Sequence, residues 1–186
     1  MADMKKKYNE EVVPALMKKL GYKNVMQVPK LKKIVLSMGI GTKMEKDAFT
    51  EGKNILAAIS GQLPVITKAK KNVANFKLRV GQPVGVMVTL RSSRMYEFLD
   101  RFVHNALPRI RDFRGVPKRG FDKVGDYNMG IQDVSVFTEI DMEKLKYPMG
   151  LNITIVTSAQ TDAEAKELLT MMEMPFAREQ ENVKYG

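Results

Sequence analysis

Stretches of alternating apolar and polar residues most restrict what this chain can fold into. Ile34–Met38, Val84–Leu90 and Leu151–Ile155 carry an apolar side chain at every second position, the pattern of a strand with one buried face. Val134–Thr138 shows a shorter version. Because stretches with helical spacing separate these strands, the order of elements predicts an α+β fold, with helices packed on one face of a mostly antiparallel sheet.

Four stretches predict helices. The first is expected to be most regular after Pro14, since proline is tolerated in a first turn but not deeper. Another carries apolar residues from Phe49 to Ile59. A third is expected to be capped by Ser92 or Ser93 and ended by Pro108. The last opens with TDAE, a capping box, directly before an apolar stripe.

The length of 186 residues and the 44% of hydrophobic residues predict one domain with a sizeable core, spanning 1–186. A protruding basic loop is expected at about 68–82 and a long loop at about 108–130. The sequence has no cysteine, which excludes disulfides, thiolate zinc sites and cysteine nucleophiles. Its apolar stretches are too short to span a bilayer, so we expect a cytoplasmic protein with no membrane partner.

The charge balance predicts a polyanionic partner. Lysine and arginine number 31 against 21 acidic residues, a net charge of +10, and each cation that neutralises a phosphate releases a counterion. If the apolar strand residues face the helices, polar side chains gather on the other face: Ser37, Thr89, Arg91, Asn152 and Thr154. Such a face offers hydrogen bonds to phosphates, riboses and bases, although an ordinary solvated face has the same composition.

The positive charge is concentrated in two places. Between Pro64 and Pro83 there is no acidic residue. The polar residues there that we expect to contact nucleic acid are Lys68, Lys70, Lys71, Asn72, Asn75, Lys77 and Arg79. Phe76 adds an aromatic ring able to stack on a base or ribose. A solvated run of charge is the alternative interpretation of this loop.

The second concentration is rich in arginine, whose planar fork holds phosphate oxygens bidentately. Its part outside the predicted helix, PRIRDFRG, supplies Arg109, Arg111 and Arg114 as candidate contacts. Within the helix, Glu97 and Arg101 have the i,i+4 spacing of an ion pair.

Enzyme chemistry finds little support in this sequence. The single histidine, His104, lies within a predicted helix and is interpreted as a structural residue. GIGTK lacks the spacing of a phosphate-binding loop. Glu139, Asp141 and Glu143 can in principle gather a hard metal, but a sheet edge explains them better. We therefore expect no catalysis, no cofactor and no metal.

Several long strings identify a family. VMQVPKLKKIVLSMGIG, LAAISGQLPVITKAKKNVANFKLRVGQPVGVMVTLR, RMYEFLDRFVHNALPRIRDFRGV and GLNITIVTSAQTDAEAKELL follow one another in this order. Over about Tyr8 to Phe176 the chain resembles the bacterial fifth large-subunit ribosomal protein, which binds 5S rRNA. The resemblance implies a place in the central protuberance and assigns the 5S contact to Ser37, Gln62, Thr89 and Arg91. The family often has asparagine at the position of Ser37, so here a hydroxyl replaces an amide.

The resemblance also implies further partners. The loop of 68–79 corresponds to one that reaches P-site tRNA and nearby 23S rRNA. The PRIRDFRG side implies a bridge to the thirteenth small-subunit protein, besides contacts with neighbouring large-subunit proteins. Two other hypotheses remain: a free RNA chaperone or translational regulator without 5S specificity, and a metal-dependent RNA-processing enzyme.

Overall fold

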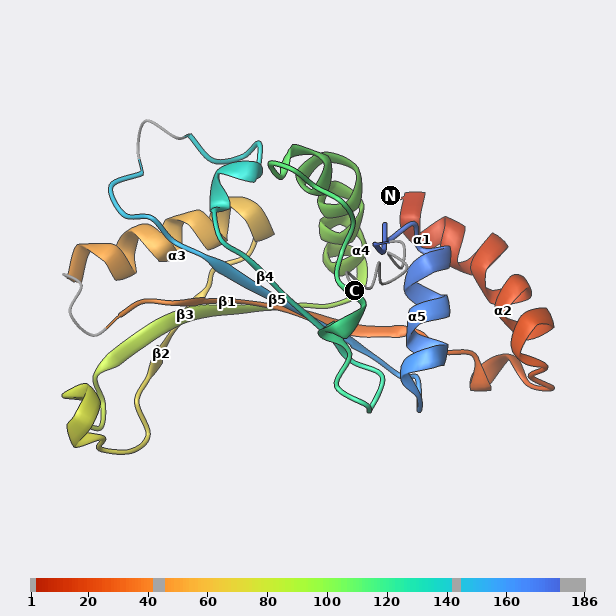
Figure 1. Ribbon diagram of the computed structural model, residues 1–186, viewed down its shortest axis with the longest axis horizontal. Coiled ribbons are helices and arrows are strands. Elements are labelled where there is room, and N and C mark those ends of the chain that lie inside the picture. Colours follow the sequence, from red (N-terminus) through yellow and green to blue (C-terminus); the bar gives the residue numbers. More distant parts are fainter. Residues whose placement is uncertain (1–2, 42–45, 142–144, 178–186) are drawn as a thin grey trace, which may run out of the picture.

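The computed structural model describes residues 3–41, 46–141 and 145–177, and is built around one twisted sheet (Figure 1). The strands lie in the order β2-β3-β1-β5-β4 and every neighbouring pair is antiparallel. Their bounds are β1 Leu31–Gly39, β2 Val65–Lys68, β3 Pro83–Leu90, β4 Tyr127–Ile131 and β5 Leu151–Thr157. The predicted α+β class is confirmed.

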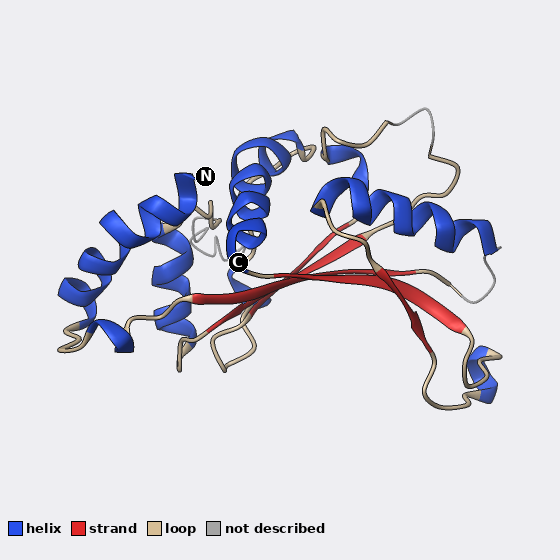
Figure 2. Ribbon diagram, turned by 180° about the vertical axis from the view of Figure 1, so that it is seen from behind, coloured by secondary structure: helices blue, strands red, loops and turns tan. Residues whose placement is uncertain are grey.

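Helices cover one face of this sheet. In Figure 2, α3 and α4 lie on the same side of the strands, whereas α1, α2 and α5 gather at one end. The helices are α1 Asp3–Lys7, α2 Val13–Leu20, α3 Lys46–Ser60, α4 Ser92–Arg101 and α5 Asp162–Met171. Two π-helical segments adjoin them, η1 Tyr8–Val12 and η4 Phe102–Ala106.

The core lies between this helical layer and the sheet. Ile34, Leu36 and Met38 of β1 are at most 1% exposed and face it. Phe98 and Phe102 stack with their ring centroids 5.7 Å apart, a spacing at which aromatic pairs add to burial. Because alternate residues of a strand point to opposite faces, burying this face fixes which side chains line the other.

Proline explains an irregularity in the first helix. Pro14 has no N–H to donate to the preceding turn. The widened π turn Tyr8–Val12 lies directly before it, and regular α-helix resumes at Val13. The helical segment therefore begins well ahead of the proline, and Tyr8 in that turn donates from its hydroxyl to the Pro29 carbonyl at 3.1 Å.

The structure corrects the expected strands. Val134–Thr138 is not a strand: Val134–Val136 forms a 3₁₀ turn, because the Asp133 side chain accepts from the Ser135 N–H at 2.9 Å. Both edge strands were missed by the sequence prediction. β2 precedes the basic loop, and β4 takes residues 127–130 out of the long loop expected at 108–130.

His104 connects three segments of the helical layer. Its Nδ1 lies 2.9 Å from the Asp100 carboxylate and its Nε2 lies 2.9 Å from that of Glu173, which Lys7 also contacts. Burial alone lowers the pKa of His104, but hydrogen bonds and the charges of Asp100 and Glu173 outweigh it, so that the pKa is raised. The protonated ring can donate to both acceptors at once, which favours a structural role for this residue.

Stability is expected to depend on pH through His104. Since its pKa is higher in the folded than in the unfolded chain, its contribution is fully present below about pH 6.5 and is lost as pH rises through the folded-state pKa. The measurement is the free energy of unfolding in urea at pH 5.5 and pH 8.5 for the wild type and for His104→Gln. The wild type should lose more stability than the variant between the two values; equal losses would contradict this assignment.

Candidate nucleic-acid interface

The face of the sheet opposite α3 and α4, called here the open face, has no helix packed on it (Figures 1 and 2). Its side chains are mostly small. The small ones come from four adjacent strands and are Thr89, Val35, Ser37, Gly39, Asn152, Thr154, Asn128 and Gly130. Two larger apolar side chains, Met87 and Val65, are paired across β3 and β2 and are exposed on the same face. Small side chains leave the backbone of a sheet close to whatever lies on it, so the open face suits a broad, shallow partner.

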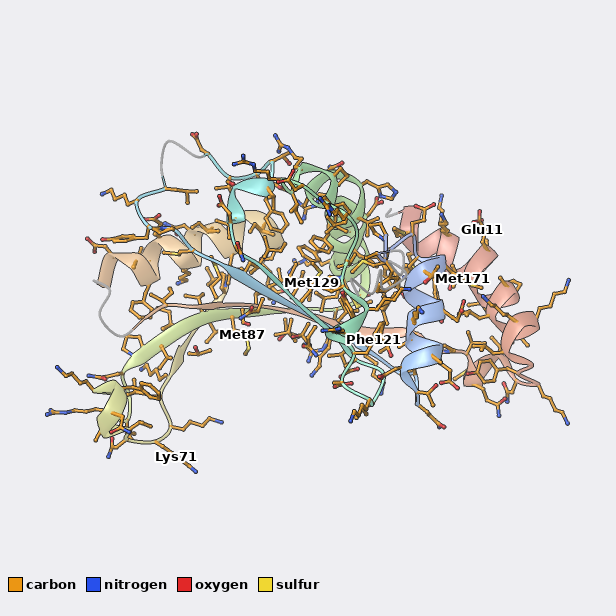
Figure 3. All side chains as sticks on the ribbon, in the orientation of Figure 1. Glu11, Lys71, Met87, Phe121, Met129 and Met171 are labelled. Atoms are coloured by element: carbon orange, nitrogen blue, oxygen red, sulfur yellow. The ribbon has the colours of Figure 1, made fainter. Side chains whose placement is uncertain are left out.

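The strand register sets the pattern of this face. Ser37 lies between Met87 on β3 and Asn152 on β5. Figure 3 shows Met87 on the side of the sheet away from α3. Thr89 is opposite Val35 and is thus a diagonal neighbour of Ser37. Thr154 donates from its hydroxyl to the Asn128 side chain at 2.7 Å, across β5 and β4.

Gln62 joins this face from the turn between α3 and β2. The Gln62 amide nitrogen donates to the Thr89 carbonyl at 3.3 Å, and its amide oxygen accepts from the Arg94 guanidinium at 3.3 Å. The Ser60 hydroxyl accepts from the Gln62 N–H at 3.2 Å and fixes the turn. Gln62, Thr89 and the exposed Arg91 thus lie together at one end of β3, with Ser37 nearby on β1.

The start of α4 differs from the expected cap. Neither Ser92 nor Ser93 caps it; the N-cap residue is Arg91, which makes no capping hydrogen bond through its side chain. Ser92 has φ +54°, in the left-handed region that favours glycine. This turn directs the chain from β3 into α4 directly beside Arg91.

The segment between β2 and β3 protrudes from the sheet, and Lys71 lies near its tip (Figure 3). Its base is closed by hydrogen bonds from the Ala69 N–H to the Gln82 carbonyl, 2.8 Å, and from the Gly81 N–H to the Ala69 carbonyl, 3.0 Å. Val73 and Leu78 form an isolated bridge nearer the tip. All seven candidate residues of this loop are exposed: Lys68, Lys70, Lys71, Asn72, Asn75, Lys77 and Arg79.

One of these residues has a structural task. The Asn72 side chain accepts from the Val80 N–H at 2.7 Å and so ties the two arms of the loop together. Phe76 is 71% exposed near the tip. The cationic side chains therefore extend from a loop whose backbone is held by internal hydrogen bonds.

The three candidate arginines lie elsewhere. Arg109, Arg111 and Arg114 are exposed, and the first two line a hollow with Gly130 and Asp133 at the edge strand β4. Strands β1 and β5 separate β4 from β3, so these arginines are not brought together with Arg91.

The segment that carries these arginines is anchored. The Val116 N–H donates to the Pro175 carbonyl at 2.8 Å, and the Tyr127 hydroxyl donates to the Pro117 carbonyl at 2.7 Å. The rings of Phe121, Tyr127 and Phe176 pack together, with neighbouring ring centroids 4.8 to 5.9 Å apart.

The expected acidic residues do not form a metal site in the described part of the chain, where no group of three or more possible ligands gathers. Glu139 instead accepts from Arg101, which corrects the expected Glu97–Arg101 pair. Glu143 lies outside the described residues. Across the same described ranges, no helix is long and apolar enough to cross a membrane.

Two residues of the open face were missed by sequence reasoning. Asn128 and Gly130 lie on β4, opposite Thr154 and Asn152. The alternation of Tyr127, Met129 and Ile131 indicates this strand, but it is only five residues long and directly follows a glycine- and lysine-rich loop. A short edge strand of this kind gives a weak pattern.

An open face that carries several small polar side chains, together with a protruding basic loop, is the kind of surface that suits a polyanionic partner. Residues 24–79 match the family described as ribosomal protein L5, and residues 83–176 match the model of that ribosomal family's C-terminus. The chain belongs to the ribosomal protein L5 family, a family of structural, non-enzymatic proteins.

Curated relatives agree over nearly the whole length. The chain is similar to large ribosomal subunit protein uL5 of Caldanaerobacter subterraneus subsp. tengcongensis, with 52% identity over 96% of this chain and 100% of the relative. The protein of the same name from Citrifermentans bemidjiense is 54% identical over 95% of this chain and 99% of the relative. The protein of the same name from Lactobacillus delbrueckii subsp. bulgaricus is 54% identical over 92% of this chain and 96% of the relative.

The left-handed Ser92 gives a stability prediction. Ser92→Gly should raise the free energy of unfolding by about 0.5–1 kcal/mol, because glycine has no Cβ to strain at φ +54°. The matched control is Ser93→Gly, which puts glycine in the first turn of α4 and should lower it by up to about 1 kcal/mol. Urea unfolding measures both; the same sign for the two variants would refute the strain at Ser92.

Proposed function

We propose that this member of the L5 family, a structural constituent of the large ribosomal subunit, binds 5S rRNA with the open face of its sheet. Its location is the ribosome, in the cytoplasm. The observation that carries the proposal is the open face itself, where Ser37 and Thr89 lie on paired strands and Gln62 and Arg91 adjoin them. These are the four residues that the family resemblance assigns to the 5S contact.

The chemistry of this surface supports RNA as the partner. Hydroxyls of Ser37 and Thr89 can donate to phosphate or ribose oxygens and accept from ribose 2′-hydroxyls. Arg91 is exposed at the end of the same strand as Thr89 and can bind phosphate bidentately. The amide nitrogen and the amide oxygen of Gln62 are both hydrogen-bonded within the protein, to Thr89 and Arg94. Gln62 therefore contributes by holding Arg94 beside Thr89.

The protruding loop is proposed to contact P-site tRNA and nearby 23S rRNA. Its exposed cations, Lys68, Lys70, Lys71, Lys77 and Arg79, supply attraction for a phosphate backbone. A rigid base supports this role, since the chain bonds to itself at Ala69, Gln82 and Val73 and holds the tip at a distance from the sheet. Asn75 and Phe76 are exposed on the same loop, and an amide and an aromatic ring can contact bases and riboses.

Arg109, Arg111 and Arg114 are proposed to face the small subunit. Their exposure at the β4 margin, away from Thr89 and Arg91, supports a partner different from 5S rRNA. The thirteenth small-subunit protein is the candidate partner for this bridge. Neighbouring large-subunit proteins are expected at other surfaces of the chain.

Binding to 5S rRNA should depend on Thr89 and Arg91. Thr89→Ala and Arg91→Ala should each weaken it by about 1–3 kcal/mol, since each removes a hydrogen bond from the interface, charge-assisted for Arg91. The measurement is equilibrium binding to 5S rRNA and to an unrelated structured RNA of equal length, over a salt series. The wild type should prefer 5S rRNA about a thousandfold at moderate salt.

Matched controls are Thr170→Ala on α5 and Arg111→Ala in the arginine-rich loop. Both should leave 5S affinity within about twofold of the wild type, because neither residue lies on the open face. If the wild type bound both RNAs equally and lost both together as salt rose, the protein would be a general RNA chaperone or regulator. The 5S proposal would then be abandoned.

The loop should be separable from the 5S contact. Replacing Lys70, Lys71 and Lys77 with alanine should leave 5S affinity nearly unchanged but weaken tRNA binding in the P site of ribosomes that carry the variant, because these exposed side chains belong to the loop that protrudes from the sheet. Filter binding of tRNA measures the effect. Lys53→Ala with Lys166→Ala, on α3 and α5, is a charge-removal control that should change neither quantity. An equal loss of 5S affinity in the loop variant would put the loop on 5S rRNA.

A further inference from the structure

A third basic segment lies outside the surfaces described so far. From Val12 to Gly41 the sequence has six lysines and no acidic residue. Lys19 pairs with Glu167 of α5. The ion pairs among the described residues include none of the others: Lys18, Lys23, Lys30, Lys32 and Lys33. The acidic side chains beside this segment come from α5, where Glu167 contacts Lys19 and Glu164 contacts Tyr22. The remaining lysines repel one another, and an anionic partner would relieve that repulsion.

The connection from α2 to β1 presents two apolar side chains in the middle of this run. Val25 is 57% exposed and Met26 is 81% exposed. The two side chains are adjacent and together form a small apolar surface, a feature that is common at binding sites. We call this segment, residues 21–30, the lysine tip.

The geometry of the tip is fixed by its own backbone. Gly21 ends α2 with φ +68°, a left-handed turn. The Asn24 side chain accepts from the Met26 N–H at 2.9 Å, and the Asn24 carbonyl accepts from the Gln27 N–H at 3.0 Å. Val25–Gln27 is thereby wound into a 3₁₀ turn. Little conformational freedom remains to be lost on binding, which favours a preformed contact site.

The tip is continuous with the open face. The Lys30 N–H donates to the Ser158 hydroxyl at 2.9 Å, which anchors the chain where it enters β1. Along β1, Lys33, Val35 and Ser37 are alternate residues and point to the same face of the sheet, so Lys33 lies on the open face. The tip and the basic β2–β3 loop lie at opposite ends of the molecule (Figure 1). The open face therefore extends between two basic ends.

We propose that the lysine tip is a second contact with the RNA that lies on the open face. In this contact Lys23 and Lys30 of the tip, with Lys33 at the start of β1, neutralise phosphates, while Val25 and Met26 lie against riboses. The inference rests on the proposed 5S contact of the sheet. The shallow minor groove of an RNA helix exposes sugars to apolar contact and phosphates at both margins. Two apolar side chains are too few for a stable protein interface, which buries about 1,000 Å² or more.

The absence of cysteine makes a direct test simple. Gln27→Cys places a single thiol beside Met26 without removing either apolar side chain, and an iron–EDTA group attached to it generates radicals that cleave nearby RNA. Asn152→Cys on the open face is the positive control, and Asn54→Cys on α3, on the covered side, is the negative one. The full chain is assembled with 5S rRNA, and separately with 5S and 23S rRNA together.

The tip proposal expects 5S rRNA to be cleaved from positions 27 and 152 but not from 54. Cleavage from 152 alone would overturn the tip contact and leave the proposed function standing. No binding of 5S rRNA at all would instead remove the proposed function. Cleavage from 27 confined to 23S rRNA would show that the tip serves another RNA, and would overturn the continuity proposed here.

Affinity gives an independent test. Lys23→Ala with Lys30→Ala should weaken 5S binding about tenfold and reduce the slope of log affinity against log salt by about 1.4–1.8, the effect of two lost phosphate contacts. Lys5→Ala with Lys6→Ala removes the same charge from α1, beside Glu10 and Glu11, and should stay within about twofold. Equal effects of the two pairs would overturn the proposal, because they would show only a dependence on net charge.

Discussion

The pairing of β1 with both of its neighbours is the constraint on which the rest of the structure depends. Ile34 and Leu36 are fully buried beneath the helical layer, and the strand is paired with β3 on one side and β5 on the other. A slip of one residue in either pairing would turn the apolar set of a strand out of the core, so burial fixes both registers. The same registers decide that Ser37, Thr89 and Asn152 share the open face, which means that core packing positions the proposed binding surface.

Sequence reasoning predicted the elements whose patterns extend over many residues. Val84–Leu90 lies within β3, and Thr161 caps α5 as expected, with its hydroxyl accepting from the Glu164 N–H at 3.4 Å. The Glu164 carboxylate accepts from the Gln160 N–H at 3.0 Å, one residue before the position that a capping box predicts. Prediction from sequence failed where the pattern of an element is short. The edge strands β2 and β4 have four and five residues, too few to distinguish from loop, and at Val134–Val136 one aspartate hydrogen bond outweighed an apparent alternation.

The candidate site was predictable in composition more than in arrangement. The exposure of every predicted lysine and arginine in the protruding loop follows from charge, since burying an unpaired cation is unfavourable. The amides were less predictable. Asn72 and Gln62 have the groups of RNA ligands, yet both bond within the protein, because an amide in or beside a turn competes for backbone and side-chain partners. Sequence shows which residues can donate, but tertiary contacts decide which remain available.

In the proposed interface these contacts separate two tasks, rigid positioning and electrostatic attraction. The hydroxyls of the open face are held by a sheet that exists before any RNA arrives, so they lose little conformational entropy on binding and suit the recognition of shape. The lysines extend into solvent on long side chains and act over a Debye length of about 8 Å, without a fixed geometry. On such a surface the side chains held by the sheet orient the partner, and the charged ends strengthen its binding.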